Sequence, residues 1–366
     1  MRHLGAAVLS TLALAASGFG QEDDRRLRIL VGTPDGPRLA VTDRQWPARH
    51  GQSTLCLWKD DALAALTLTV DDNMSQDHEW WLEQGKKYGL RITWFVITGR
   101  VGTGGPWGTW EGFRKLLKAG HDVQSHTVTH LHTEGDWKGI EWEYSESARQ
   151  IEANLPGHRA VCLAYPGGKN SGLNDPGVAA RYYLGCRGTT GSINAADRIN
   201  YANTHSTGLN IGTAKFPSQD LMTALEKRPD GHARLWRSWV CCHFHGVEKL
   251  KTELAGRFAA VRQKAEEGAL WVALFREAVQ YGQERDTATL SVKEASPARI
   301  VLALSDRMED GLFGFPLTVK TRVDGWAAVK ATQDGKPLAA KIIEHEGGRF
   351  ALVQAIPDRG DVTLTP

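Results

Sequence analysis

The sequence predicts an α/β protein with a parallel sheet or barrel, followed by a small antiparallel β-domain. Short apolar runs alternate with amphipathic segments of helix length between residues 61 and 286. Strands that are joined by helical crossovers of this kind run parallel. From residue 287 onward, alternating runs are separated by Gly, Asp and Pro turns, and no helical pattern interrupts them. We therefore expect an α/β domain at 61–286 and a β-domain at 287–366.

The expected elements follow from local pattern. Leu66–Val70 is an apolar, strand-like run, and the segment after it has helical periodicity. The expected strands of the α/β domain are residues 66–70, 92–97, 121–125, 160–165, 182–187 and 239–244. The expected helices are residues 76–88, 110–119, 141–155 and 252–263. The clearest expected strands of the β-domain are residues 299–304, 317–323 and 349–353.

The N-terminus has the pattern of an export signal. Arg2 precedes an apolar stretch at 4–16, and small residues and a charged run follow it. This stretch is too short to span a bilayer, and no other hydrophobic run approaches that length. We expect a signal peptide at 1–20, an N-terminal extension at 21–60, and export to the periplasm, the cell envelope or the exterior. A buried N-terminal helix is the alternative.

Composition narrows the class of protein. The net charge is +2, from 44 basic and 42 acidic residues, and no basic cluster alternates with aromatic residues. Nothing therefore points to a nucleic-acid partner or an anionic membrane surface. The five cysteines have no zinc-finger or redox spacing, and most lie in apolar runs. We expect buried free thiols and at most one disulfide.

Two adjacent carboxylates follow the first strand of the α/β domain. Asp71 and Asp72 come directly after Leu66–Val70. On an extended backbone they would point to different sides, so that one could bind a metal while the other accepts a proton. For the pair alone, a solvated turn with helix-capping aspartates is the plainer interpretation.

A pair of histidines follows another expected strand. His126 and His130 are four residues apart, and they face the same way if this stretch turns helically. Many such pairs are only exposed, but this pair stands at a strand end, downstream of the aspartates. Two histidines and one carboxylate with open positions are typical of a catalytic metal site.

Two further strands end in residues that suit catalysis or ligand binding. His243 and His245 stand at the end of an apolar strand, and alternation places both on one side of it. A hydrogen-bonded core histidine is an equally good interpretation of either one. Pro166 and Gly167 belong to a rigid turn in which a backbone N–H can approach a ligand closely.

Together these clusters resemble the polysaccharide deacetylase family (carbohydrate esterase family 4, the NodB homology domain) over about residues 60–285. The T-x-D-D motif of the family is matched in full by Thr69–Asp72, and its H-[ST]-x-x-H motif by His126–His130. The final motif, a hydrophobic strand that ends in histidine, fits His245 better than His243. The resemblance implies a distorted, NodB-like (β/α) barrel for the α/β domain.

The chain departs from the family at its third and fourth motifs. In R-x-P-x-G, Pro166 and Gly168 are present, but Ala164 stands where the family has arginine, and no D-x-x-D-W motif is visible. In the family that arginine orients the catalytic aspartate. Arg187, at the end of the expected strand at 182–187, is the candidate substitute, and an ordinary surface arginine is the alternative.

The resemblance implies a role for each matched residue. The implied metal ligands are Asp72, His126 and His130, and Zn²⁺ is the expected ion. The implied catalytic groups are Asp71 as the general base, His245 as the general acid, and the backbone N–H of Gly167 as a stabiliser of the oxyanion.

The expected function is metal-dependent removal of acetyl groups from a polysaccharide or cell-wall glycan, with nitrogen on an amino sugar as the expected position of the acetyl group. O-acetyl esterase activity and a non-catalytic carbohydrate-binding protein with a vestigial site are the alternatives. A metalloprotease is disfavoured because no glutamate lies between the two histidines. Among the 13 tryptophans, Trp107, Trp110 and Trp137 are candidates for stacking on sugar rings.

Overall fold

The computed structural model describes residues 44–133, 137–169, 172–208, 218–226 and 235–366. The predicted signal peptide at 1–20 and most of the predicted N-terminal extension lie outside the described residues. Among the helices that are described, none is both long and apolar enough to cross a membrane.

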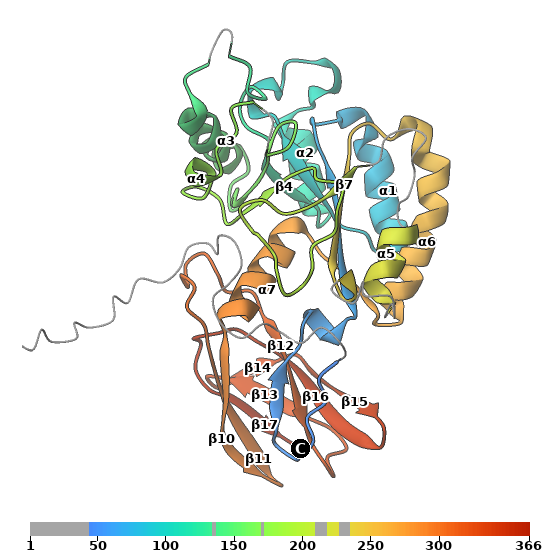
Figure 1. The fold of residues 1–366 in the computed structure, drawn as a ribbon, viewed down its shortest axis with the longest axis vertical. Helices are drawn as coiled ribbons and strands as arrows, with labels where there is room; N and C mark the ends of the chain where they lie inside the picture. Colours follow the sequence, from blue (N-terminus) through green and yellow to red (C-terminus); the bar gives the residue numbers. More distant parts are fainter. Residues whose placement is uncertain (1–43, 134–136, 170–171, 209–217, 227–234) are drawn as a thin grey trace, which may run out of the picture.

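A curled, parallel sheet forms the centre of the α/β domain (Figure 1). Its strands are ordered β6-β5-β4-β3-β2-β8-β7, and β9 pairs with β2. Every one of these pairings is parallel, which confirms the predicted α/β class. The bounds are β2 Ala64–Val70, β3 Ile92–Val96, β4 Asp122–Ser125, β5 Cys162–Ala164, β6 Gly185–Arg187, β7 Thr207–Gly208, β8 Trp239–Phe244 and β9 Leu270–Val272.

Helices pack on both faces of this sheet. Leu66 and Leu68 of β2 belong to one buried cluster, with side chains from α1, α2, α3 and α6. Ala65, which alternation turns to the opposite face, belongs to a second cluster with side chains from α7. Burial on both faces explains why the central strands read as continuous apolar runs. The bounds are α1 His78–Tyr88, α2 Trp110–Lys118, α3 Ile140–Asn154, α4 Pro176–Ala179, α5 Ser218–Leu225, α6 Lys251–Glu266 and α7 Phe275–Thr287.

The C-terminal part consists of two antiparallel sheets, as predicted (Figure 1). Their orders are β1-β12-β16-β15 and β10-β11-β17-β13-β14. Leu302 and Val319, one from each sheet, lie in the same buried cluster as Trp239 of the α/β domain, so that the apolar core is continuous between the two domains. The bounds are β1 Ser53–Leu55, β10 Thr289–Ser296, β11 Arg299–Ser305, β12 Leu317–Arg322, β13 Lys330–Gln333, β14 Lys336–Leu338, β15 Ala340–His345, β16 Gly348–Ala355 and β17 Val362–Thr365.

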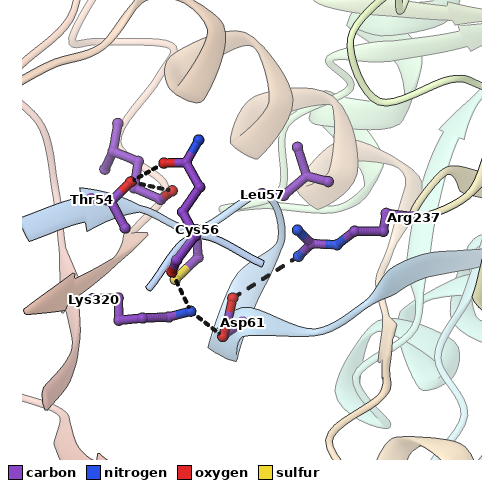
Figure 2. A pocket seen from close by; sticks show the side chains of 8 residues that line it. Thr54, Cys56, Leu57, Asp61, Arg237 and Lys320 are labelled. Carbon is purple, nitrogen blue, oxygen red and sulfur yellow. Dashed lines mark hydrogen bonds and ion pairs between the residues drawn. The ribbon is translucent and has the colours of Figure 1, made fainter. Parts of the chain in front are cut away.

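A buried ionic cluster lies where the two domains meet (Figure 2). Asp61, in the segment that leads into β2, forms an ion pair with Lys320 of β12, with Nζ 2.6 Å from Oδ2. Arg237, just before β8, approaches the other oxygen at 4.0 Å. All three side chains are almost fully buried, and buried charges are tolerated only when they are paired. This cluster therefore fixes β12 against the α/β domain.

Two elements at the same junction differ from the prediction. Strand β1, within the expected N-terminal extension, pairs with β12 of the C-terminal sheet. Helix α7 was not expected, because its buried side includes Gln283, Glu284 and Arg285, which apolar periodicity does not reveal. All five cysteines are buried and free, which confirms the expected thiols.

Candidate metal centre and catalytic residues

The site residues come from strands that end at the same edge of the parallel sheet. Asp71 and Asp72 follow β2, His126 follows β4, Arg187 ends β6, and His245 comes just after β8. Functional groups in barrel-type enzymes gather at the carboxyl ends of parallel strands. The topology thus brings together residues that are far apart in the sequence.

Three side chains form a cluster that suits a metal ion. The Oδ1 atom of Asp72 lies 3.5 Å from Nε2 of His126 and 3.6 Å from Nε2 of His130. One ligand atom from each residue lies within 4.8 Å of the other two. Asp72 Oδ1 is buried and has no hydrogen-bond partner among the described residues, which is costly unless a cation occupies the position between the imidazoles. These donors fit a divalent ion of the zinc type.

The backbone orients one of these imidazoles. Nδ1 of His126 lies 2.8 Å from the carbonyl oxygen of Ala164. A carbonyl oxygen only accepts hydrogen bonds, so Nδ1 carries the hydrogen and Nε2 presents its lone pair to the cluster. Metal-binding histidines are commonly fixed in this way by a second group.

The loop between His126 and His130 is not helical. The expectation that the two side chains face the same way had assumed a helical turn. Thr127 and His130 have φ values of 68° and 65°, in the left-handed region. Glu143 of α3 stabilises this loop: its Oε2 accepts hydrogen bonds from the backbone N–H groups of Val128 (2.8 Å) and Thr129 (2.9 Å). A bent loop, not a helical turn, brings the imidazoles together.

The two aspartates occupy different environments, although the backbone between them is not extended. Asp72 has a φ of 57° and is partly exposed, whereas Asp71 is buried. Burial alone would raise the pKa of Asp71, but the guanidinium of Arg187 and nearby imidazoles outweigh it and lower the pKa to about 2. Asp71 is therefore ionised, and its Oδ1 accepts no hydrogen bond from the part of the chain that the structure describes.

Arg187 is the partner of Asp71. Its Nη2 lies 2.5 Å from Asp71 Oδ2, and its side chain is fully buried. Nη1 donates to Oγ of Ser206 at 3.2 Å, and the guanidinium carbon lies 5.4 Å from the centre of the Phe95 ring. Arg187 is thus not a surface arginine. It contacts the carboxylate of Asp71, for which Ala164 has no cationic side chain to offer.

Sheet register explains how Arg187 reaches that position. Ala164 and Arg187 are direct partners in the parallel pairing of β5 with β6. A side chain at either position points to the same side of the sheet, because register partners share a face. The strand beside Ala164 therefore supplies the guanidinium that contacts Asp71.

The two candidate acid histidines have different contacts. His245 lies just beyond β8, its side chain is 48% exposed, and its Nε2 lies 3.5 Å from Asp72 Oδ2. His243 is half-buried, and its Nδ1 lies 2.8 Å from Ser206 Oγ, whose own hydrogen is donated to the carbonyl oxygen of Gly188 (2.5 Å). Burial and the nearby Arg187 lower the pKa of His243 to about 3, so this imidazole is neutral.

The turn after β5 is held by its own hydrogen bonds. Asn174 Nδ2 donates to the carbonyl oxygens of Pro166 and Gly168, both at 3.0 Å. Gly167 is exposed and has a φ of 65°. Gly168 cannot be replaced easily, because a Cβ atom there would meet Thr189 Oγ1 at 2.2 Å. The turn thus presents the backbone of Gly167 at the surface.

The three tryptophans proposed for sugar stacking are partly exposed. The indole of Trp107 lies 5.6 Å from the guanidinium of Arg100. Trp110 packs towards Phe113, with ring centres 6.2 Å apart. No contact in the described part of the chain distinguishes Trp137 as a binding residue.

Several residues of the site gave no signal in the sequence. Ser206 links Arg187 to His243, and Glu143 supports the histidine loop. Asn73 accepts from the backbone N–H of Ile97 (2.8 Å) and so ties the loop after Asp72 to the next strand. Each contact depends on the tertiary structure, which spacing along the chain does not reveal. Of the three residues, only Asn73 could have been suggested by the sequence, because it directly follows the two aspartates.

Comparison with known proteins adds a family and several relatives. Residues 60–180 match the family model described as polysaccharide deacetylase. That match includes both aspartates and both metal-site histidines, whereas Arg187 and His245 lie beyond it. A curated relative, a gellan lyase from a Bacillus species, is 35% identical over 344 residues. The alignment covers 88% of this chain and 14% of that relative, so that the chain spans about one seventh of its length.

Solved structures of a deacetylase and of a carbohydrate esterase are also similar to this chain. The Streptococcus pyogenes deacetylase PplD in complex with acetate is 25% identical, with a TM-score of 0.34, over 38% of this chain and 62% of that chain. A family 4 carbohydrate esterase from Streptomyces lividans in complex with acetate is 18% identical, with a TM-score of 0.34, over 57% of this chain and 91% of that chain.

Proposed function

This chain carries a polysaccharide deacetylase family domain, and on that premise we propose that it removes acetyl groups from a polysaccharide with a divalent metal. The observation that carries the proposal is the cluster of Asp72, His126 and His130 beside a buried, ionised carboxylate. The substrate within the proposal is an amino-sugar glycan, and the bond cleaved is the acetamide C–N bond.

Asp72, His126 and His130 would hold the metal, and Zn²⁺ suits their donor atoms. When bound, such an ion polarises the acetyl carbonyl and lowers the pKa of a water molecule from 15.7 to about 7. An acetamide is a poor electrophile, so this chemistry is needed at neutral pH. Metal analysis of the purified chain would test the identity of the ion.

Asp71 acts as the general base in this proposal. Arg187 binds one of its oxygens. The second oxygen, Oδ1, accepts no hydrogen bond from the described residues and can take a proton from the attacking water. Arg187 also fixes the orientation of the carboxylate, as the family's missing arginine would. A positioned base of this kind contributes about 10²- to 10⁴-fold to the rate.

His245 acts as the general acid that protonates the departing nitrogen. It is the histidine whose Nε2 faces Asp72, whereas the Nδ1 hydrogen of neutral His243 is engaged with Ser206. Histidine is the side chain that most often carries out such proton transfers in enzymes. The backbone N–H of Gly167, an exposed residue of the turn after β5, is proposed to stabilise the oxyanion.

Acetate release from chito-oligosaccharides and from acetylated xylan, measured in parallel, tests the bond that is cleaved. We expect faster release from the chito-oligosaccharides, because an amine is a poor leaving group unless it is protonated, and His245 is the proposed source of that proton. Faster release from xylan would establish an O-acetyl esterase instead. Gellan belongs in the same screen, since the curated relative is named for it.

A non-catalytic carbohydrate-binding role is the second candidate. The absent motif arginine favoured it, but the ion pair between Arg187 and Asp71 supplies the missing cation. The base, the acid candidate and three ligand side chains are all present.

We also propose that residues 1–20 are a signal peptide that directs export of the protein. N-terminal sequencing of the mature protein would test this proposal.

A further inference from the structure

A second concave site lies beside the metal centre. It is a pocket of about 420 Å³ between the loop after β3, the histidine loop after β4 and helix α3. Thr129 of the histidine loop lines it, and so does His132, whose ring centre lies 6.1 Å from that of His130. The pocket is thus next to the metal ligands, at the same edge of the sheet.

The lining of this pocket is basic. Arg100 and Lys138 line it together with neutral or titratable groups, and no carboxylate lines it among the described residues. Neither cation has an ion-pair partner within 4.0 Å in the part of the chain that the structure describes. The carboxylate of Glu146 acts on Lys138 from a distance, but its ion pair is with Arg149, at 2.6 Å.

Both cations are held at the pocket wall by aromatic rings. The Arg100 guanidinium lies 5.6 Å from the Trp107 ring centre, and the Lys138 ammonium lies 5.0 Å from that of Trp142. Cation–π contacts of this length restrict long side chains without neutralising their charge. Less rotamer entropy is then lost when an anion binds.

We propose that this pocket binds the carboxylate of a uronic acid residue, so that the substrate is an anionic polysaccharide. The inference rests on the proposed function, because the bound chain must continue from the pocket to the metal centre. Two cations that rest on aromatic rings, and that have no ion-pair partner among the described residues, complement one or two carboxylates, whereas a neutral sugar offers no opposite charge. The pocket is then a substrate-binding site in which Arg100 and Lys138 determine specificity.

Binding without turnover tests this proposal. The full chain carrying Asp71→Asn is titrated at low salt with oligogalacturonate, which has no acetyl groups, and with xylo-oligosaccharide of equal length. We expect tighter binding of the uronate, and about 3- to 10-fold weaker binding when Arg100→Gln and Lys138→Gln are combined. Xylo-oligosaccharide binding should not change. Lys336→Gln, an exposed lysine of β14, is the matched control.

Two results would overturn the proposal: equal affinity for both oligosaccharides, or uronate binding that the double variant leaves unchanged. Thermal unfolding of each variant shows whether the fold is retained. Charge-selective binding without acetate release from any glycan would contradict the proposed function while leaving the pocket assignment intact. Acetate release with no charge selectivity would contradict the pocket assignment alone.

Discussion

Arg187 and Asp71 form a buried ion pair, with Nη2 2.5 Å from Oδ2, although they are 116 residues apart in the sequence. The guanidinium comes from the strand position that is in register with Ala164. The strand beside Ala164 therefore supplies a cationic partner for the carboxylate of Asp71, the proposed general base.

Removing that partner should impair both stability and turnover. Arg187→Met leaves the Asp71 charge buried and unpaired, which costs about 3–5 kcal/mol in the free energy of unfolding. Arg187→Lys retains a cation and should lose less stability. Denaturant unfolding and acetate release measure the two effects. Equal stability of Arg187→Met and the unmodified chain would show that the ion pair contributes little.

The metal should depend on the histidine pair. His126→Ala and His130→Ala each remove an imidazole from the cluster, so we expect the bound metal, measured by elemental analysis, to fall well below one ion per chain. His132→Gln changes an exposed histidine near the same loop and should keep its metal. Full metal content in the His126 and His130 variants would place the ion elsewhere.

Glu143 is not a metal ligand, but we expect it to strengthen metal binding by holding the histidine loop in place. Glu143→Ala removes the acceptor of two backbone N–H groups in the histidine loop, which frees the loop that presents His130. Loss of a supporting group of this kind typically weakens metal binding about 10- to 100-fold. Chelator competition measures the affinity. Glu141→Ala, on the exposed side of the same helix, is the control.

Glu284 should make stability depend on pH. Burial and the nearby Asp306 raise its pKa from 4.5 to about 9, although the Phe315 N–H bond opposes the shift. The folded state therefore retains a proton that the unfolded state loses, and stability falls as the pH rises from 4.5 towards 9. Glu284→Gln should flatten this decline between pH 7 and 9 in thermal unfolding. Glu346→Gln changes an exposed glutamate and should show the same pH dependence of stability as the unmodified chain. If Glu284→Gln also showed that same pH dependence, Glu284 would not be its cause.

The sequence was sufficient for the parts of the fold that local pattern encodes. Apolar runs such as β2 and β3 predicted the parallel sheet, and turn-separated strands predicted the antiparallel part. The pairing of β1 with β12 could not be predicted, because strand pairing between distant segments depends on tertiary packing. Helix α7 was missed because it buries polar side chains at the domain junction.

The residues of the candidate site likewise fall into those that the sequence predicted and those that it did not. Asp71, Asp72, His126 and His130 were identified because contiguous motifs contain them. Their arrangement was not, since it depends on positive φ values at Asp72, Thr127 and His130. Ser206 and Glu143 act through contacts that no spacing encodes.

The most direct test of the account is acetate release by Asp71→Asn, assayed together with its metal content. Asparagine has nearly the shape of aspartate but cannot take a proton from water. We predict that turnover falls by at least about 10²-fold and that metal content stays equal to that of the unmodified chain. Unchanged turnover with metal bound would contradict the assignment of Asp71 as the general base.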